Sequence, residues 1–553
     1  MENKTCQNCK QNFVIEEDDF SFYEKMKVPA PNKCPNCRQQ ARILYRNFKT
    51  LYKRESSLSG KSIVSVYSPD APFPVYSPSE WWSDTWDALT YGRDIDWSQS
   101  FFKQFHNLTI DVPHYSIMNT KSSACEYSNM TYESKNCYLI FGCVNNEDCA
   151  YGHIVWNSRD TLDSLYAFKC ESCYECIDCL GSNNLLFSQE SESCAYSVGL
   201  FDCRSCTNCI GCVGLVGKSY HIFNKPVSRE EYFSFLEEHP LKDKKNIDFI
   251  LTKTEEMRRT IPQRAFFGSH NNNISGNHIY YAKNIHCSFD IKSGEDSKYC
   301  HTAQKVVNTN DCSFCGGTSG VEQCYQILTC LGERILGSHS CIDSHDIFYS
   351  DTCFGCNNLF GCFGLRQKSY CIFNKQYTKT EYEALVPKLI EHMKKYNEWG
   401  EFFPKGHSPF AYNESIAYEY FPITKEVAII NGYRWKDDIP STSGKGTLSD
   451  EELPKNPADY TDNLTKEILT CKKCQKNYKL IHDEIGFYKR MNLAIPNKCF
   501  NCRHEARMLA RNPQLLWDTK CTSCKKDIKT SYPPEKQKIY PLHCESCYQQ
   551  EVV

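Results

Sequence analysis

Two stretches of the sequence place a cysteine at every third position, CESCYECIDC at 170–179 and CRSCTNCIGC at 203–212. Cysteines in such a pattern are typical of a metal cluster, a disulfide network or a packed column of small side chains. The chain has 36 cysteines among 553 residues, and 24 of them lie in the central region that contains these two blocks. Any fold for this chain therefore has to hold a large number of thiols.

The two ends of the chain carry the same cysteine module, with an offset of 465 residues. CQNC at 6–9 aligns with CKKC at 471–474, and PNKCPNCRQQAR at 31–42 aligns with PNKCFNCRHEAR at 496–507. Each copy is a C-x2-C pair followed by a second pair, the arrangement that delivers four thiolates to one tetrahedral zinc ion. The predicted ligands are Cys6, Cys9, Cys34 and Cys37 at one end and Cys471, Cys474, Cys499 and Cys502 at the other.

This module resembles the bacterial "probable zinc-ribbon" family over about forty residues at each end. The resemblance is carried by C-x2-C, a central aromatic FY pair and P-x-x-C-x2-C-R-x-x-R, seen here at Phe22, Tyr23, Cys34, Cys37, Arg38 and Arg42. It implies zinc binding and no chemical activity.

A second pair of knuckles follows at the C-terminal end, CTSC at 521–524 and CESC at 544–547. Its predicted ligands are Cys521, Cys524, Cys544 and Cys547. The N-terminal counterpart has Ser56, Ser59, Ser77 and Glu80 instead, and hydroxyl groups are poor zinc ligands at neutral pH. We therefore expect about three zinc ions per chain, while the sequence leaves open whether the serine site binds anything.

Each main module is followed by arginines at i, i+4 and i+8, which share one face of a helix. They are Arg38, Arg42 and Arg46, and Arg503, Arg507 and Arg511. Residues 1–54 carry a net charge of +5 and residues 466–553 one of +8. Since the whole chain has a net charge of −3, the residues between them carry −16. The arginines are candidate polyanion-binding residues, with RNA or a ribonucleoprotein as the partner. The alternatives are a solvated helix face and ion pairs with the acidic centre of the same chain.

The central region predicts a mostly β fold, a parallel β-helix (solenoid) with short capping helices and zinc-ribbon or treble-clef-like modules at both ends. Short aromatic or β-branched runs are separated by Ser, Asn, Asp and Gly, and tyrosines recur every 22–24 residues. A larger repeat with an offset of 150 aligns 212–232 with 362–382, which predicts two halves with the same cap. In this repeat Cys209 corresponds to Leu359, so a packing role is favoured for the central cysteines over further zinc, iron–sulfur clusters or disulfides.

The chain as a whole is similar to an uncharacterised family of cysteine-rich bacterial proteins. The resemblance rests on the zinc knuckles at both ends and on the signature K-S-Y-x-I-F-N-K, at 218–225 and 368–375. It implies the architecture and leaves the activity open.

The predicted organisation has eight parts. They are a zinc ribbon (1–54), a degenerate ribbon with a connector (55–110), two solenoid halves with caps (111–240 and 241–400), an aromatic-rich docking segment (401–440), a flexible linker (441–465) and two zinc ribbons (466–515 and 516–553).

The sequence favours a non-enzymatic zinc-binding scaffold or adaptor. SGKS at 59–62 lacks the first glycine of a phosphate loop, and common hydrolase and dinucleotide signatures are missing. A protein-binding adaptor competes with RNA binding. Weaker alternatives are a carbohydrate-active enzyme using Asp290, Glu295, Asp296, Lys292 and Lys298, and a thiol redox sensor using Cys170 and Cys203. The N-terminus has no apolar leader and no segment predicts a membrane span, so we expect a cytoplasmic protein. The oligomeric state and pathway stay open.

Overall fold

The structure, a computed structural model, describes residues 1–317 and 319–552. Packing divides the chain into two compact units, and each unit combines segments that are far apart in sequence. Unit 1 contains Met1–Ile117, Phe266–Asp438 and Gln514–Leu516, and unit 2 contains Met118–Ala265, Ile439–Pro513 and the chain from Trp517 onward. Among the described helices, none has the length and apolar composition needed to cross a bilayer.

Both units are built around a parallel β-solenoid, which confirms the predicted fold class. Strand partners differ by twelve residues: Phe141 pairs with His153, His153 with Leu165, and Leu165 with Ile177. The regular coil is therefore twelve residues long, and the second half departs from it at Asn310–Tyr325 (offset 15) and Tyr325–Leu336 (offset 11). The tyrosine spacing of 22–24 residues, which suggests a coil of about 22 residues, is not the coil length, because these tyrosines mark every second coil.

Each coil consists of four three-residue segments. Every third residue has a positive φ, as at Asp160, Asp163 and Tyr166, and the residue after it points into the solenoid. An L-residue in this left-handed conformation costs about 1–2 kcal/mol, except that Gly, Asn and Asp adopt it more readily. This requirement explains the many Asn and Asp residues between the short strands.

The inward row explains the cysteine pattern. All thirteen cysteines from Cys125 to Cys212 are separated by multiples of three residues, and all but Cys125 are buried. The narrow interior takes small side chains, but the amide of each inward residue also needs an acceptor. Ser188 supplies one, because its hydroxyl donates to Leu186 O (2.9 Å) and accepts from the Leu200 amide (2.9 Å) one coil later. Serine and cysteine are both small and able to bond in this way, so they dominate the row.

Each solenoid half ends in the same polar cap, as the 150-residue repeat predicted. In the first half the Asn224 side chain bonds both the amide (2.9 Å) and the carbonyl (2.8 Å) of Val213. In the second half Asn374 does the same to Phe363, with both distances 2.8 Å. The asparagine thus replaces the backbone of a further coil, and the K-S-Y-x-I-F-N-K signature marks the end of each solenoid half.

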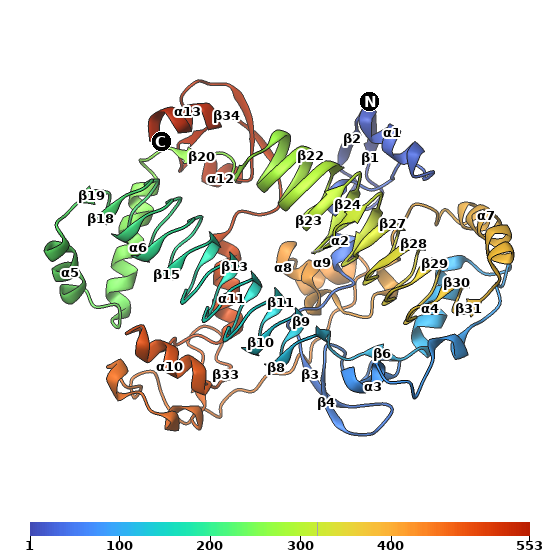
Figure 1. The fold of residues 1–553 in the computed structure, drawn as a ribbon, viewed down its shortest axis with the longest axis horizontal. Helices are drawn as coiled ribbons and strands as arrows, with labels where there is room; N and C mark the ends of the chain where they lie inside the picture. Colours follow the sequence, from blue (N-terminus) through green and yellow to red (C-terminus); the bar gives the residue numbers. More distant parts are fainter. Residues whose placement is uncertain (318, 553) are drawn as a thin grey trace. The chain divides into compact units, whose positions relative to one another are not determined.

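Unit 1 contains the second solenoid half, the N-terminal modules and the helices after the cap (Figure 1). Its α-helices are α1 (Glu17–Lys25), α2 (Pro35–Ile43), α3 (Pro78–Trp81), α4 (Phe101–Asp111), α7 (Lys379–Lys395), α8 (Ile416–Tyr420) and α9 (Lys425–Ile430), and 3-10 helices are η1 (Ala88–Tyr91), η2 (Lys405–His407) and η3 (Tyr412–Glu414). Its solenoid strands are β21 (Gly268–Ser269), β22 (Asn272–Lys298), β23 (His301–Val307), β24 (Asn310–Ser313), β25 (Val321–Glu322), β26 (Tyr325–Leu328), β27 (Gly332–Leu336), β28 (Ser344–Phe348), β29 (Asn357–Phe360), β30 (Ser369–Ile372) and β31 (Lys375–Gln376). The terminal modules add β1 (Glu2–Thr5), β2 (Asn12–Ile15), β3 (Tyr52–Glu55), β4 (Ser62–Ser65), β5 (Val75–Tyr76) and β6 (His114–Tyr115).

Unit 2 contains the first solenoid half and the C-terminal modules. Its solenoid strands are β7 (Asn119–Thr120), β8 (Ser123–Glu126), β9 (Asn129–Tyr132), β10 (Lys135–Tyr138), β11 (Phe141–Val144), β12 (His153–Trp156), β13 (Leu165–Phe168), β14 (Ile177–Leu180), β15 (Asn183–Leu186), β16 (Ala195–Val198), β17 (Thr207–Ile210), β18 (Ser219–Ile222) and β19 (Lys225–Pro226). The other strands are β20 (Gln263–Arg264), β32 (Leu469–Thr470), β33 (Asn477–Tyr478), β34 (Trp517–Lys520), β35 (Asp527–Thr530) and β36 (Leu542–His543). The helices are α5 (Arg229–Glu238), α6 (Lys244–Arg258), η4 (Pro457–Asp459), η5 (Asp462–Thr465), α10 (His482–Arg490), α11 (Phe500–Ala510), α12 (Pro534–Gln537) and α13 (Glu545–Val552).

Two segments differ from their sequence interpretation. Residues 441–465, expected to be a flexible linker, pack on the zinc-ribbon-like module of unit 2: Tyr460 is buried with its hydroxyl on Leu493 O (3.1 Å), and Leu448 pairs with Leu469. The start of the range 241–400, assigned to the second solenoid half, forms α6 instead. Apolar residues spaced along both segments pack locally, a signal that their polar composition hid.

Candidate metal centres and their docking on the solenoid

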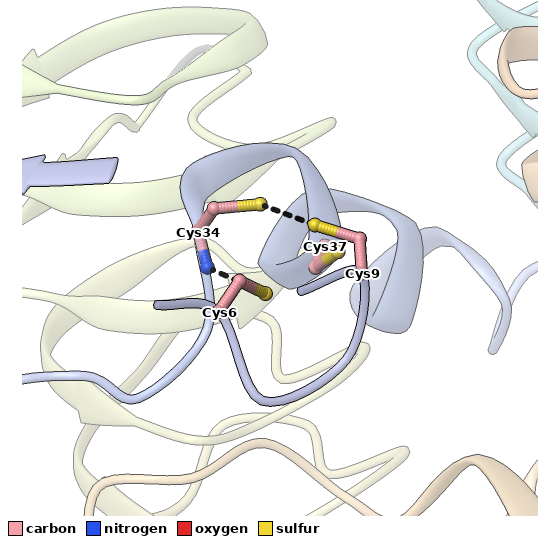
Figure 2. A group of neighbouring side chains, drawn as sticks. All are labelled: Cys6, Cys9, Cys34 and Cys37. Atoms are coloured by element: carbon pink, nitrogen blue, oxygen red, sulfur yellow. Dashed lines mark hydrogen bonds between the residues drawn. The ribbon is translucent and has the colours of Figure 1, made fainter. Parts of the chain in front are cut away.

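Three groups of four cysteines have the geometry of a metal centre. Their sulfurs lie within 4.8 Å of one another in each predicted set: Cys6, Cys9, Cys34 and Cys37; Cys471, Cys474, Cys499 and Cys502; and Cys521, Cys524, Cys544 and Cys547. Figure 2 shows the first set, with its side chains converging from two knuckles. In all three groups the second and third sulfurs are 3.7 Å apart. A tetrahedron with zinc–sulfur bonds of about 2.3 Å has edges of about 3.8 Å, so the spacing fits zinc.

The first cysteine of each group is prepared to be a thiolate. Burial alone would raise the pKa of Cys471, but hydrogen bonds from the backbone amides of Cys474, Cys499 and Lys473 lower this pKa to about 6. Burial likewise opposes, and backbone amides achieve, a lowered pKa at Cys6 and Cys521. The Cys34 amide, for example, donates to Cys6 Sγ at 3.3 Å. Such amides stabilise charged sulfur, so the donor set matches a tetrathiolate metal site.

The serine-containing module keeps the knuckle backbone but replaces the metal ligands by a hydrogen-bonded cluster. The Ser56 amide bonds Lys61 O as the Cys6 amide bonds Gln11 O. The hydroxyls of Ser56 (2.5 Å) and Ser77 (2.7 Å) donate to Glu80 Oε2, and Ser59 also bonds this carboxylate. Burial would raise the pKa of Glu80, yet these hydroxyls lower it to about 2. Within the described residues the four side chains therefore satisfy one another without an ion.

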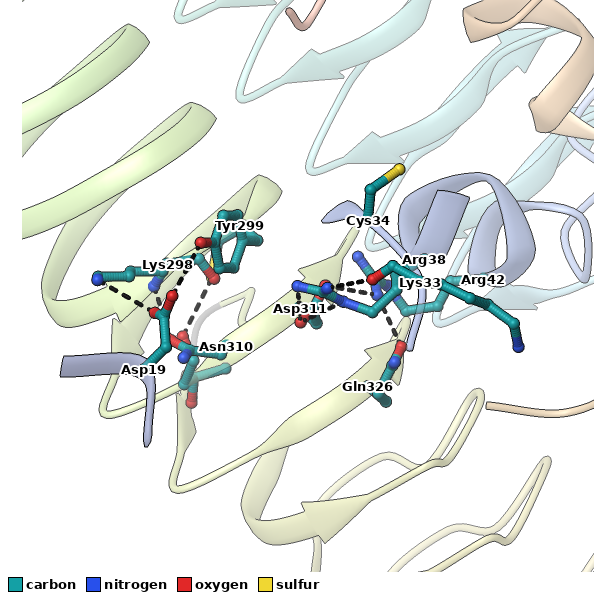
Figure 3. A network of polar contacts seen from close by, with 12 residues as sticks. Asp19, Lys33, Cys34, Arg38, Arg42, Lys298, Tyr299, Asn310, Asp311 and Gln326 are labelled. Carbon is teal, nitrogen blue, oxygen red and sulfur yellow. Dashed lines mark hydrogen bonds and ion pairs between the residues drawn. The ribbon is translucent and has the colours of Figure 1, made fainter. Parts of the chain in front are cut away.

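In unit 1 the N-terminal module is docked on the second solenoid half through arginines of α2. Arg38 Nε contacts both carboxylate oxygens of Asp311 at 2.9 Å, and Arg42 Nη1 donates to Asp311 (3.0 Å) and Gln326 (2.8 Å), as Figure 3 shows. Arg46 bonds Thr329 and stacks over Phe314. Asp311 is a corner residue with φ of 56°, fully buried with both partners. A carboxylate fixed at a coil corner thus orients two buried guanidinium groups.

Unit 2 repeats this docking with the C-terminal module and the first solenoid half. Arg503 Nε (2.9 Å) and Arg507 Nη2 (3.0 Å) contact Asp163 Oδ1, and Arg507 also bonds Glu175 at 2.9 Å. Arg511 bonds Asp178 at 2.9 and 2.8 Å. The same 465-residue offset that relates the modules therefore relates their contacts.

A second polar contact is also repeated. In unit 1 the Tyr299 hydroxyl lies 3.2 Å from Asp19 of α1, which also pairs with Lys298 (Figure 3). In unit 2 the Tyr151 hydroxyl donates to Glu484 of α10 at 2.7 Å. Asp19 and Glu484 are again 465 residues apart, so each module is held at two places.

The six arginines named as polyanion-binding residues are buried, each at most 6% exposed. Their guanidinium groups contact the solenoid, and most of them form ion pairs with its carboxylates. This arrangement corresponds to the alternative in which the arginines pair with the acidic centre of the same chain. Sequence reasoning gave the arginine face but missed Asp163 and Asp311. The sequence signal that could have identified them is an aspartate at a coil corner, the positive-φ position, in each solenoid half.

The central cysteines line the solenoid interior. Cys173 Sγ lies 3.3 Å from Glu171 O and 3.5 Å from Ser182 O one coil away, and Cys176 and Cys179 bond in the same way. No disulfide joins any of the 36 cysteines, and within the described chain none of the central ones belongs to a group with metal-binding geometry. The residues at issue for redox sensing, Cys170 and Cys203, are buried. The packing interpretation therefore describes the arrangement, while Cys287 is the exposed exception.

The candidate carbohydrate site does not assemble around a shared point. Asp290 contacts His278 and Gln514, Glu295 pairs with Lys283, and Lys298 pairs with Asp19. These charges face different partners, so nothing in this arrangement supplies a pair of carboxylates across a substrate.

Comparison with known proteins gives no assignment. No family model matches the chain and no curated protein matches it. A solved structure described as a "putative acetyltransferase" from Desulfovibrio desulfuricans G20 aligns at 9% identity and a TM-score of 0.10, over 46% of this chain. The chain spans 65%, less than two thirds, of that protein. A TM-score this low carries no argument, so the function has to be inferred from the geometry of the chain itself.

Proposed function

We propose that this protein is a non-enzymatic scaffold stapled by three structural zinc ions, and that it serves as an adaptor for a protein partner. The observation that carries the proposal is the combination of three tetrathiolate sets with the buried arginine contacts that fix two of these modules on the solenoid. Bound zinc would supply a tetrahedral cross-link between the two knuckles of each set, with no coordination position left for a reaction.

The cysteines and the arginines are coupled through the helix that follows the second knuckle. Cys34 is the N-cap of α2, Cys37 lies in its first turn, and Arg38 is the next residue. Cys499 and α11 have the same relation to Arg503. Fixing the sulfurs fixes the start and direction of each helix, which aims the arginines at the corner carboxylates.

A protein partner is favoured over RNA by the use of the arginines. All six arginines on the helix faces are already paired or buried, so the basic ends lose the residues that best suit a phosphate backbone. The solenoid, in contrast, exposes large aromatic side chains such as Tyr127, Tyr196 and Tyr281. Tyrosine is enriched in protein interfaces.

Metal removal tests the scaffold directly. We expect chelation under non-denaturing conditions, or the substitution Cys37→Ser, to release zinc. Either change should accelerate hydrogen exchange in α2 and β24, which are in contact. Cys287→Ser is the matched control, because this exposed thiol lies outside the metal sets. Unchanged exchange in α2 after zinc loss would contradict the coupling. Salt-sensitive binding of single-stranded RNA to the intact protein would instead favour the RNA alternative over a protein adaptor.

A further inference from the structure

The two solenoid caps have the same residues but different surroundings. In unit 1 the cap of the second half is covered: Ile372, Phe373 and Asn374 are all fully buried. In unit 2 the matching residues Ile222, Phe223 and Asn224 remain partly exposed. The repeat therefore provides a covered and a partly open version of one surface. In unit 2 the helices α5 and α6 pack on Phe223, and Ile261, Tyr548 and Val552 lie beside Gly214, which leaves the face of Lys218–Lys225 as the open part.

The segment that covers the cap in unit 1 is Asp87–Asp94, which includes η1 and packs against β31. It makes two backbone contacts: Asn374 Nδ2 donates to Ala88 O (3.1 Å), and the Arg93 amide donates to Phe373 O (3.1 Å). Its two acidic ends make ion pairs, Asp87 with Lys368 (3.5 Å) and Asp94 with Lys375.

Four cap groups that receive this segment have counterparts in the open cap. Asn224 and the Phe223 carbonyl match the two backbone contacts, and Lys218 and Lys225 match the two lysines. Both lysines are exposed, and among the described residues no carboxylate lies within ion-pair distance of either. The open cap thus has two cations at the places where the covered cap binds the two ends of an acidic segment.

Close approach of the segment also requires a glycine. A Cβ on Gly92 would lie 2.7 Å from Asn374 O, which is shorter than any ordinary contact. An occupant of the open cap should therefore contain a short helical turn like η1, carry acidic residues about seven positions apart, and have a small residue near its second end.

We propose that the open cap of the first solenoid half, formed by Lys218–Lys225, docks a short segment of a partner protein with the turn and the charges of Asp87–Asp94. Backbone contacts at Asn224 and Phe223 give this docking its register, and Lys218 and Lys225 select the acidic ends. The inference deepens the proposed adaptor function by naming the surface and the kind of segment that it takes.

The probe is a fluorescein-labelled peptide of residues 85–96, titrated into the full zinc-loaded protein and followed by anisotropy. The covered cap in unit 1 keeps its own segment, because an intramolecular segment competes at a high effective concentration. We expect saturable binding of one peptide per chain. A peptide with Gly92→Ala should bind at least about tenfold more weakly, because its Cβ would collide with the Asn224 carbonyl as it would with that of Asn374.

The decisive variant is Lys218→Glu with Lys225→Glu, which changes exposed side chains and leaves the hydrogen bonds of Asn224 to Val213 intact. We expect it to abolish binding of the native peptide and to bind a peptide with Asp87→Lys and Asp94→Lys. Lys489→Glu, at an exposed site on α10, is the control and should leave binding unchanged. Absence of saturable binding, or binding that is indifferent to the charge reversal, would overturn the docking surface.

Zinc is measured on the same samples, so that the two proposals fail separately. Three zinc ions per chain without peptide binding would remove the docking surface and leave the scaffold. Fewer than three zinc ions would count against the scaffold itself.

Discussion

The contact between Asp311 and two arginines gives the sharpest test of how the N-terminal module is held. Asp311→Asn keeps the side-chain volume and the left-handed corner conformation, which asparagine adopts readily. It removes the charge that faces Arg38 and Arg42, all three of which are buried. Arg42 keeps Gln326, a neutral partner, so its charge is left without compensation.

Breaking a buried ion pair by removing one partner costs about 3–5 kcal/mol. Since about 1.4 kcal/mol corresponds to a factor of ten, the opening equilibrium of the docked module should rise by about 10² to 10³ or more. Hydrogen exchange of the α2 amides measures this opening. Zinc content should stay unchanged, because the variant leaves all thiols in place.

The matched control is Asp346→Asn. Asp346 is also a corner residue, with φ of 57°, and forms a two-point contact with Arg334 at 2.7 and 2.9 Å. Its pair is exposed, with 45% of the Arg334 side chain accessible, so we expect a cost below about 1 kcal/mol. Equal effects of the two variants would refute the argument that burial makes the Asp311 contact important.

Three further predictions follow from the same structure. Asp163→Asn should weaken docking in unit 2 less than Asp311→Asn does in unit 1, because Arg507 keeps the Glu175 carboxylate; hydrogen exchange of α11 would show it. Ser188→Ala should lower the free energy of unfolding by about 1–3 kcal/mol, because the buried Leu200 amide loses its acceptor. Ser188→Cys should lower it less, since a cysteine sulfur can accept such an amide, as Cys315 Sγ does at 3.5 Å. Melting temperatures measure both effects, and equal losses would contradict the acceptor role of Ser188. Burial raises the pKa of Glu484 to about 7, so its contribution to the free energy of unfolding is fully present below the unfolded pKa of about 4.3 and is lost as the pH rises through 7. Glu484→Gln should therefore raise the melting temperature relative to the native protein at pH 8 and not at pH 4. A difference that does not depend on pH would exclude the titration of Glu484.

The terminal modules were predictable from sequence because a metal site needs a local ligand pattern. Two C-x2-C pairs determine which thiols meet, and the structure brings together all three predicted sets. The duplicated signature likewise predicted two identical caps, because Asn224 and Asn374 act within their own turn and the coil beside it.

The coil length was harder to predict, although its signal was present. The recurring tyrosines do not belong to the inward row, and their spacing varies between 22 and 24 residues. The thirteen inward cysteines of the first half, in contrast, are all separated by multiples of three. A count of cysteine spacings modulo three would have given the three-residue segment, and the pairing offset of twelve then needs the structure.

The docking of the modules could not be read from the sequence. Asp311 and Arg38 are 273 residues apart, and Asp163 and Arg503 are 340 apart. The arginine periodicity identified the face but not its partner, because a buried ion pair and a solvated face have the same helical pattern. The partner becomes evident only when the corner position of each aspartate is known.

The most direct test of the account is the zinc and iron content of the purified native protein, measured together with its free thiols after denaturation in chelator. The account predicts about three zinc ions per chain, no iron and thirty-six reduced thiols, because the twelve terminal thiols hold metal and the central ones pack. Six or more zinc ions, or iron in the central region, would contradict the conclusion that the solenoid cysteines are packing residues.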